Sequence, residues 1–269
     1  MRQAIFAELA GTFLLVFFGC GVVATAVALG APVGLFQVAI VWGLGLAAAI
    51  FLTGHLSGAH LNPAITLAFA AFSDFPKARV PSYIAAQFAG AFLAAAAVYA
   101  LFGNAIGAME SAAGIVRGEA GSEASAMIFG EYFPNPGGKP LADAAMPVPA
   151  ATAFFGEFLG TALLAFAIFG FVNPRNEGGP AKMTPLAIGL TLTVLICIFA
   201  PLTMAGFNPA RDLAPRLFSA LAGWGSVPFS ANGIGWLTVY VLAPCGGAMA
   251  GAAASKLLYG RQLVPTEGA

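Results

Sequence analysis

Long stretches without a charged residue are the feature that most restricts how this chain can fold. Asp, Glu, Lys and Arg are all absent from residues 9–73, 80–109, 183–210 and 217–255. A helix needs about 20 mostly apolar residues to cross a bilayer. Runs such as Ala91–Ala97 lack the alternating pattern of a membrane β-strand. We therefore predict an all-α membrane protein with six transmembrane helices, over residues 5–27, 34–53, 81–102, 151–172, 183–200 and 235–258.

The composition agrees with a surface that faces lipid. The 11 basic and 11 acidic residues make up only 8 % of the 269 residues, whereas soluble proteins carry about 25 %. The net charge is zero and no basic cluster is present in the sequence, so we expect no nucleic-acid partner. Cys20, Cys197 and Cys245 lie in apolar stretches, which favours small buried hydrophobic residues over a disulfide framework or a metal site.

The distribution of basic residues predicts the orientation of the chain in the membrane. Basic residues in short loops favour the cytoplasmic side, and one set of predicted helix ends carries Arg2, Lys77, Arg79, Arg175, Lys182, Lys256 and Arg261. Both termini are therefore predicted to face the cytoplasm. The segment 103–150, rich in Gly, Pro and Ser, is predicted to be an external loop with at most short ordered pieces.

Two halves of the chain repeat each other. Ala7–Phe17 and Gly156–Phe166 match at six of eleven positions, and the tripeptide Asn62-Pro63-Ala64 recurs as Asn208-Pro209-Ala210. Three spanning helices in each half place the second half upside down relative to the first, which is an inverted repeat. We expect a single transmembrane domain over residues 1–269, with halves 1–102 and 151–258 joined by the loop 103–150.

Each Asn-Pro-Ala tripeptide has the residues that start a helix. Asn is a good N-cap, and Pro suits the first helical position. Each tripeptide is therefore predicted to begin a short re-entrant half-helix, and inverted symmetry brings the two N-termini together near the midplane. Their positive ends would repel cations. The amides of Asn62 and Asn208 would orient a passing water or hydroxyl and so interrupt proton hopping. The alternative is that each tripeptide is only a capped turn.

Arg211 stands at membrane depth, where a charge is costly, and in the first turn of a half-helix, where the dipole disfavours a cation. We interpret it as a hydrogen-bond donor that faces a pore lumen. The alternative is a structural salt bridge to Asp212. Adjacent positions on a helix do not face each other, which argues against that pairing.

Four further titratable residues lie in or near apolar stretches. Glu8 and Glu157 are repeat mates, and each is predicted to accept backbone N–H groups of a re-entrant segment, with a proton relay as the alternative. His60 is expected to support the first Asn-Pro-Ala turn, and His55 is a candidate to face a wet vestibule. Their spacing without Cys or carboxylate neighbours predicts no metal, and we expect no cofactor.

These motifs resemble those of the major intrinsic proteins, the superfamily of aquaporins and glycerol facilitators. The resemblance covers nearly the whole chain and is strongest at Ser57–Ala64 and Asn208–Asp212. Asp212 after Asn-Pro-Ala-Arg, the later Arg216, and the loop segments Ile115–Gly118 and Tyr132–Pro136 are similar to the glycerol-facilitator branch. The resemblance implies an aquaporin-like fold and a homotetramer with one pore per subunit in a plasma membrane, here a bacterial inner membrane.

The resemblance also implies where the selectivity filter lies. Its four positions fall on Trp42, Ile196, Ala205 and Arg211. Typical glycerol facilitators have Trp, Gly, Phe and Arg there, and the Ile and Ala of this chain are closer to the filter of plant nodulin-type channels. Phe207 is a further candidate to line the pore. Whether it refills the space that Ala205 vacates is left open at this point.

The expected function is a passive channel that conducts glycerol, other small uncharged solutes and water while it excludes ions and protons, with no enzymatic chemistry. A channel that prefers water, urea or metalloid acids and has low glycerol flux is the alternative within this class. A secondary transporter is a rival from another class, because transporters also use inverted repeats and broken helices. An intramembrane hydrolase built on Ser57 with His55 or His60 lacks the Gly-x-Ser-x-Gly context.

Overall fold

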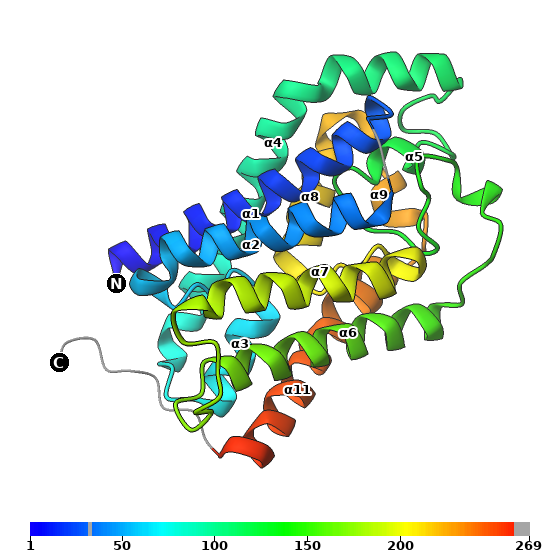
Figure 1. Cartoon of the computed structure of the whole chain (residues 1–269). Coiled ribbons are helices and arrows are strands. Elements are labelled where there is room, and N and C mark those ends of the chain that lie inside the picture. The colour runs from blue at the N-terminus through cyan, green and yellow to red at the C-terminus, as the bar shows by residue number, and fades with distance from the viewer. Residues whose placement is uncertain (32–33, 261–269) are drawn as a thin grey trace.

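The computed structural model describes residues 1–31 and 34–260, and Arg261 lies outside the described residues. In this part of the chain six helical spans are long and apolar enough to cross a membrane, which confirms the predicted all-α fold. Each span is built around one long helix, and the last span continues from α10 through η5 into α11 (Figure 1). Their bounds are α1 Arg2–Ala28, α2 Leu35–Ser57, α4 Val80–Ala113, α6 Ala150–Phe171, α7 Thr184–Thr203, α10 Gly235–Leu237, η5 Thr238–Leu242 and α11 Ala243–Tyr259.

Two shorter helices begin at the Asn-Pro-Ala tripeptides, as predicted. The helix α3 spans Pro63–Phe72 and α8 spans Pro209–Ser219. The side chain of Asn62 accepts a hydrogen bond from Ala64 N, and that of Asn208 accepts from Ala210 N and Arg211 N. These bonds satisfy donors that the first turn of a helix leaves unpaired, which is why both helices start at these residues.

The remaining elements are short and lie in the connections between the long helices. The prediction of a loop over residues 103–113 was wrong, because α4 continues as a helix to Ala113 at the upper edge of Figure 1. This stretch contains good helix formers, and Gly114 ends it in a left-handed conformation with φ 66°. The short elements are η1 Lys77–Arg79, α5 Glu123–Ala126, η2 Leu141–Asp143, η3 Ala181–Met183, η4 Ala220–Trp224 and α9 Val227–Ser230.

Equivalent helix pairs pack in the same way in the two halves. A Cβ atom at Gly90 of α4 would overlap the carbonyl oxygen of Leu9 in α1. A Cβ atom at Gly247 of α11 would likewise overlap the carbonyl oxygen of Phe158 in α6. Glycine therefore permits the close backbone approach that membrane helices use in place of a hydrophobic driving force. The match between these two contacts is what an inverted repeat of one structural unit predicts.

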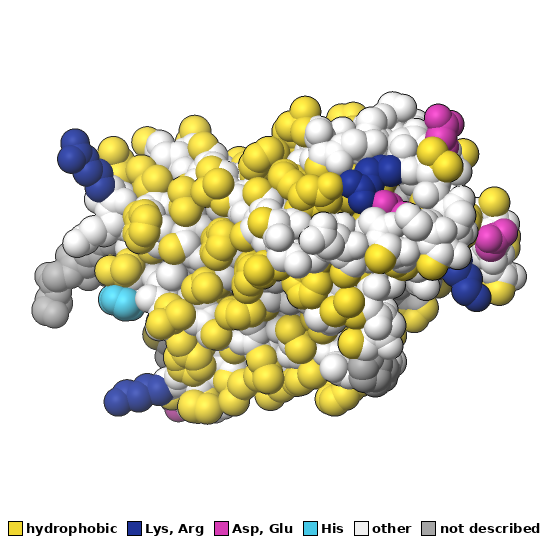
Figure 2. Space-filling view, turned by 90° about the horizontal axis from the view of Figure 1, so that it is seen from above, with side chains coloured by type: hydrophobic (Ala, Val, Ile, Leu, Met, Phe, Trp, Pro, Cys, Tyr) yellow, Lys and Arg dark blue, Asp and Glu magenta, His cyan; other side chains and the backbone are white. Residues whose placement is uncertain are grey.

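The outer surface is largely apolar between its two ends (Figure 2). Large hydrophobic side chains on several long helices are exposed, including Phe51, Leu93, Phe155 and Ile198. Charged side chains lie mainly towards the two ends of the molecule in this view. A protein that exposes such a band needs an apolar environment around it, which is what a multi-pass membrane protein has.

Candidate functional site

The N-termini of α3 and α8 meet inside the bundle. Asn62 Nδ2 donates to the carbonyl oxygen of Phe207 at 2.8 Å, and Asn208 Nδ2 donates to the carbonyl oxygen of Leu61, also at 2.8 Å. Each Asn thus caps its own helix with its side-chain oxygen and binds the other half of the chain with its side-chain nitrogen. The reciprocal pair holds the two helix N-termini against each other.

The segments before these helices have an unusual backbone. Ala59 and Leu61 in the first segment, and Ala205 and Phe207 in the second, have positive φ angles of 47°, 52°, 61° and 52°. Non-glycine residues rarely adopt this conformation, and it persists only where the surrounding structure holds it. Such irregular backbone at membrane depth is tolerated where it lines a cavity or is buried in protein.

The buried carboxylate of Glu8 supports the backbone of the first segment, residues 58–62. Its carboxylate accepts hydrogen bonds from His60 N at 2.9 Å, Leu61 N at 2.8 Å, Ser57 Oγ at 2.7 Å and Gln87 Nε2 at 2.7 Å. The Glu8 side chain is fully buried. Its oxygens therefore satisfy backbone donors that would otherwise be unpaired in an apolar interior.

Glu157 supports the backbone of the second segment, residues 204–208, in the same way. Its carboxylate accepts from Gly206 N at 2.9 Å, Phe207 N at 2.7 Å and Thr203 Oγ1 at 2.6 Å. These bonds match those of Glu8 and agree with backbone support. They give no indication of a proton relay, because neither Glu8 nor Glu157 lies among the residues that line the cavity described next.

A cavity of about 110 Å³ runs along both segments. Part of its lining comes from residues 58–62 and 204–208, which include both capping asparagines, and from Arg211. The rest is mostly apolar and carries side chains from α1, α2, α6 and α7, such as Leu15, Leu46, Leu164, Ile188 and Leu192. A solute in this cavity would therefore meet both hydrogen-bonding groups and hydrocarbon.

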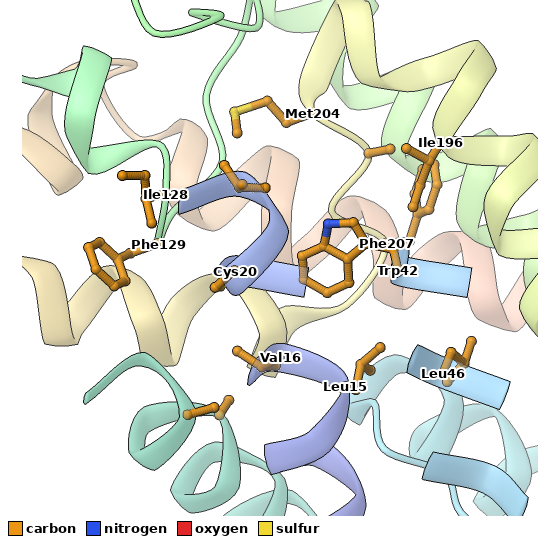
Figure 3. Close-up of a cluster of buried hydrophobic side chains, with 14 of the residues drawn as sticks. Leu15, Val16, Cys20, Trp42, Leu46, Ile128, Phe129, Ile196, Met204 and Phe207 are labelled. Carbon is orange, nitrogen blue, oxygen red and sulfur yellow. The ribbon is translucent and has the colours of Figure 1, made fainter. Parts of the chain in front are cut away.

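The four filter positions inferred from the resemblance all line this cavity. The guanidinium carbon of Arg211 lies 4.1 Å from the centroid of the Trp42 ring, within the range of a cation–π contact. Trp42, Ile196 and Phe207 belong to one cluster of buried hydrophobic side chains (Figure 3). Ala205 occupies its position with a methyl group only. The structure therefore brings together one aromatic side chain, two aliphatic side chains and one cation.

Phe207 also lines the cavity and is almost completely buried. Its ring makes an edge-to-face contact with Phe199 at 5.8 Å between centroids. A Cβ atom at Gly160 would overlap the Phe207 ring, so glycine in α6 makes room for it. These contacts place the ring against α6 and α7.

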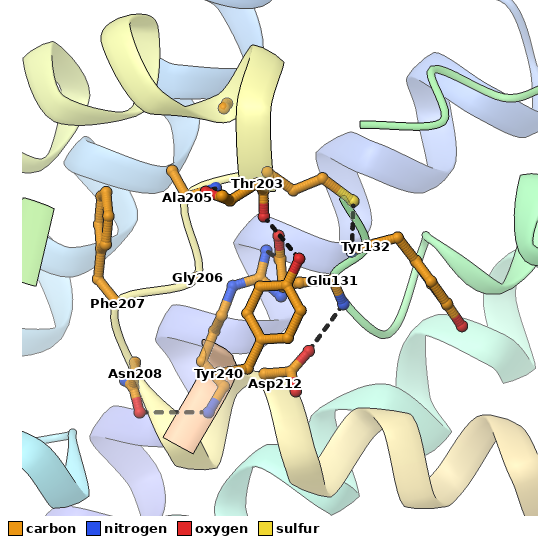
Figure 4. A network of polar contacts seen from close by, with 12 residues as sticks. Glu131, Tyr132, Thr203, Ala205, Gly206, Phe207, Asn208, Asp212 and Tyr240 are labelled. Carbon is orange, nitrogen blue, oxygen red and sulfur yellow. Dashed lines mark hydrogen bonds and ion pairs between the residues drawn. The ribbon is translucent and has the colours of Figure 1, made fainter. Parts of the chain in front are cut away.

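Arg211 forms an ion pair with Glu131, which lies in the connection between α4 and α6. The alternative pairing with Asp212 is wrong, because Asp212 instead binds Arg216 through Nε at 3.0 Å and Nη2 at 2.8 Å. Asp212 Oδ1 also accepts from Glu131 N at 2.7 Å. Figure 4 shows Glu131 and Asp212 on the same side of the segment that carries Gly206 and Phe207. Burial raises the pKa of the Glu131 carboxyl to about 8, and Arg211 opposes this shift.

The two histidines lie in different environments. His60 is buried, with Nδ1 3.2 Å from Thr66 Oγ1 and its ring stacked on Phe69 at 4.6 Å, so it packs against α3. His55 is exposed near the end of α2 and is not among the residues that line the cavity. Within the described residues no group of three His, Cys, Asp or Glu side chains could hold a metal ion.

Comparison with known proteins decides the family. Residues 1–259 match the family model described as Major intrinsic protein. The chain belongs to the major intrinsic protein family. The glycerol uptake facilitator protein of Escherichia coli K12 is 41 % identical over 258 residues, which cover 96 % of this chain and 88 % of that protein. The facilitator of the same name from Pseudomonas aeruginosa is 40 % identical over an equal span.

Two further relatives extend the comparison. The propanediol uptake facilitator of Salmonella typhimurium is 39 % identical over 263 residues, which cover 96 % of this chain and 94 % of that protein. The X-ray structure of the aquaglyceroporin from Plasmodium falciparum superimposes with a TM-score of 0.79 at 26 % identity and covers 94 % of both chains. Glycerol facilitators of the major intrinsic protein family are channels and not enzymes.

The structural roles of several polar residues around the site were missed by sequence reasoning. Gln87 and Thr203 bind the two supporting carboxylates, and Glu131 and Arg216 surround Asp212. The spacing of four residues between Asp212 and Arg216 on a helix was a usable signal for an ion pair. Gln87 carried a weaker signal, as a polar residue in an apolar helix. Glu131 carried none, because it lies in a connection with several other acidic residues.

Proposed function

We propose that this protein is a passive channel for glycerol, other small uncharged solutes and water, and that it excludes ions and protons. The observation that carries the proposal is the cavity lined by Asn62, Asn208 and the Arg211–Trp42 pair, which offers both polar and apolar groups. A polyol has a matching hydroxyl edge and hydrocarbon edge. The names of its facilitator relatives support glycerol as the solute.

Each set of site residues has a role in this proposal. Trp42, Ile196, Ala205 and Arg211 set the width and polarity of the filter. Asn62 and Asn208, followed by Pro63-Ala64 and Pro209-Ala210, present their amides and two positive helix ends to the solute, which disfavours cations and orients water. Glu8, Glu157, His60 and Asp212 hold the surrounding backbone and side chains in place.

The finer points of assembly are also proposals. The halves 1–102 and 151–258 form one channel domain, which assembles into a homotetramer with one pore per subunit. The protein lies in a plasma membrane, the inner membrane of a bacterium, with both termini in the cytoplasm. The basic residues of one set of helix ends and the bacterial relatives support this placement.

Stopped-flow light scattering of proteoliposomes tests the proposed function. After a hyperosmotic glycerol step we expect rapid shrinkage from water efflux, followed by re-swelling as glycerol enters, both faster than in empty liposomes. A glycerol permeability equal to that of empty liposomes, together with high water flux, would show that the assignment as a polyol channel is wrong.

One observation favours a second candidate within the same class. Ile196 and Ala205 replace the Gly and Phe of typical glycerol facilitators, and this moves bulk from one wall of the filter to another. Urea and neutral metalloid acids then become candidate solutes. A panel with glycerol, urea and boric acid separates the two candidates. Glycerol should permeate fastest if the proposal holds, whereas urea or boric acid should do so if the second candidate holds.

A further inference from the structure

The connection between α4 and α6 folds back onto α8 at Glu131. Asp212 Oδ1 accepts a hydrogen bond from the Glu131 backbone N–H at 2.7 Å. Arg216 Nη2 donates to the Glu131 carbonyl oxygen. Two side chains of one helix therefore hold both backbone groups of Glu131, and its side chain forms an ion pair with Arg211 of the same helix. The Glu131 side chain is fully buried.

Glu131 is the carboxylate that pairs with the positive charge of Arg211. Asp212 is bound to Arg216, and Glu157 accepts from Thr203 and from backbone N–H groups. Within the described residues neither carboxylate oxygen of Glu131 has a hydrogen-bond partner other than the ion-paired arginine. A buried charge with so few partners is costly and calls for an explanation other than fold stability.

We propose that Glu131 is a positioning residue of the filter, which holds the Arg211 guanidinium and sets how many of its N–H donors a passing solute can use. This inference rests on the proposed function as a channel. An ionised Glu131 occupies one guanidinium nitrogen and compensates its charge. A neutral Glu131 binds that nitrogen more weakly, so a solute hydroxyl can take its place, and the positive charge of Arg211 is no longer compensated.

The choice between solutes then follows the charge of Glu131. Glycerol can offer a third hydroxyl to a freed N–H donor, whereas propane-1,2-diol has a methyl group in its place. Because one net hydrogen bond corresponds to about a fivefold change in equilibrium, the ratio of glycerol to propane-1,2-diol permeability should be about fivefold higher when Glu131 is neutral. Water permeability should change less, since water fits either state.

The groups around Glu131 place this change in an accessible pH range. Burial and the nearby carboxylates raise the pKa of Glu131, the arginines lower it, and the result is about 8. Glu131 should therefore be mostly neutral below pH 7 and mostly ionised above pH 9. The titratable and charged groups that face it are Arg211, Asp212 and Arg216 on α8, Glu157 on α6, Cys20 on α1, Tyr240 on η5 and Tyr132 beside it.

The flux experiment compares wild type with Glu131→Gln in proteoliposomes that have the same pH on both sides, between about pH 6.5 and 9.5. The Gln side chain has nearly the same size but no charge, so it binds the guanidinium more weakly and represents neutral Glu131 at every pH. We expect the wild-type permeability ratio to rise about fivefold towards low pH, and the Glu131→Gln ratio to stay at the high value throughout. Glu131→Asp keeps the charge and should keep the pH dependence. Glu119→Gln is the matched control, because it removes an exposed charge from the same connection and should behave as wild type.

A second readout does not depend on flux. In protein labelled with ¹⁵N-arginine, the guanidinium signal of Arg211, assigned by its loss in Arg211→Lys, should shift with pH in wild type and not in Glu131→Gln. If wild type conducts no solute above empty liposomes, the proposed function fails, while this titration still decides whether Glu131 controls Arg211. A signal and a permeability ratio that are the same in wild type and Glu131→Gln at every pH would overturn the inference.

Discussion

Replacement of Glu157 by Gln tests whether the buried carboxylates hold the pore segments. Glu157 Oε1 accepts from Thr203 Oγ1 and Gly206 N, and Oε2 accepts from Phe207 N. An amide has one acceptor oxygen, and its NH₂ group only donates. Whichever way the introduced amide turned, at least one buried backbone N–H or hydroxyl donor would face a second donor. The variant Glu157→Gln therefore removes a bond without a change in side-chain size.

The expected cost follows from these bonds. An unpaired buried N–H group costs about 1–3 kcal/mol, and a hydrogen bond to a neutral acceptor is weaker than one to a charged acceptor by about 1 kcal/mol. The sum for the three bonds is about 4 kcal/mol. A loss of 1 kcal/mol lowers the melting temperature of a chain of this size by about 2–4 °C, so the melting temperature should fall by roughly 10 °C.

The assay is thermal unfolding of the purified protein in detergent, followed by tryptophan fluorescence. The matched control is Glu177→Gln, which changes an exposed side chain in the connection after α6 and should leave the melting temperature unchanged. Glu8 occupies the equivalent position in the first half of the chain and makes an equivalent set of hydrogen bonds. Glu8→Gln should therefore lower the melting temperature to a similar extent. A Glu157→Gln melting temperature within about 2 °C of wild type would refute the reasoning.

Two further predictions concern the filter. Arg211→Val should raise the leak of protons or cations, because it removes a positive charge from the lining of the cavity. A pH-sensitive dye inside proteoliposomes measures the leak, and an unchanged leak would exclude Arg211 from the exclusion mechanism. Gly19→Ala should lower glycerol flux in the light-scattering assay, because the added Cβ atom would overlap the Trp42 ring. A flux equal to that of wild type would show that the ring position is unimportant.

The main features of the fold could be predicted because lipid imposes simple rules. Apolar runs had to become spanning helices, and Asn62 and Asn208 before Pro had to begin helices. The end of α4 was missed because the whole segment 103–150 was assigned as a loop on its content of Gly, Pro and Ser, although its prolines begin only at Pro134. In the structure Glu110 instead binds Arg117 and Ser125, which ties the next segment back to this end of the helix.

The candidate site could be predicted only in part. The meeting of the two half-helix N-termini, at which Asn62 and Asn208 each bind the other segment, follows from the repeat, since symmetry brings equivalent segments together. The partner of Arg211 could not be predicted, because Glu131 reaches it through a connection whose path depends on contacts with α8. The position of the Phe207 ring likewise depends on the space at Gly160, which only the packing of α6 reveals.

The central claim is that solutes pass through a fixed pore without coupling to an energy source. Glycerol uptake into proteoliposomes, measured against glycerol concentration with and without proton and sodium gradients, tests it most directly. A passive channel predicts an uptake rate that rises linearly with glycerol concentration and does not change when a proton or sodium gradient is imposed. A rate that saturates and increases with an imposed ion gradient would contradict the claim and would indicate a secondary transporter.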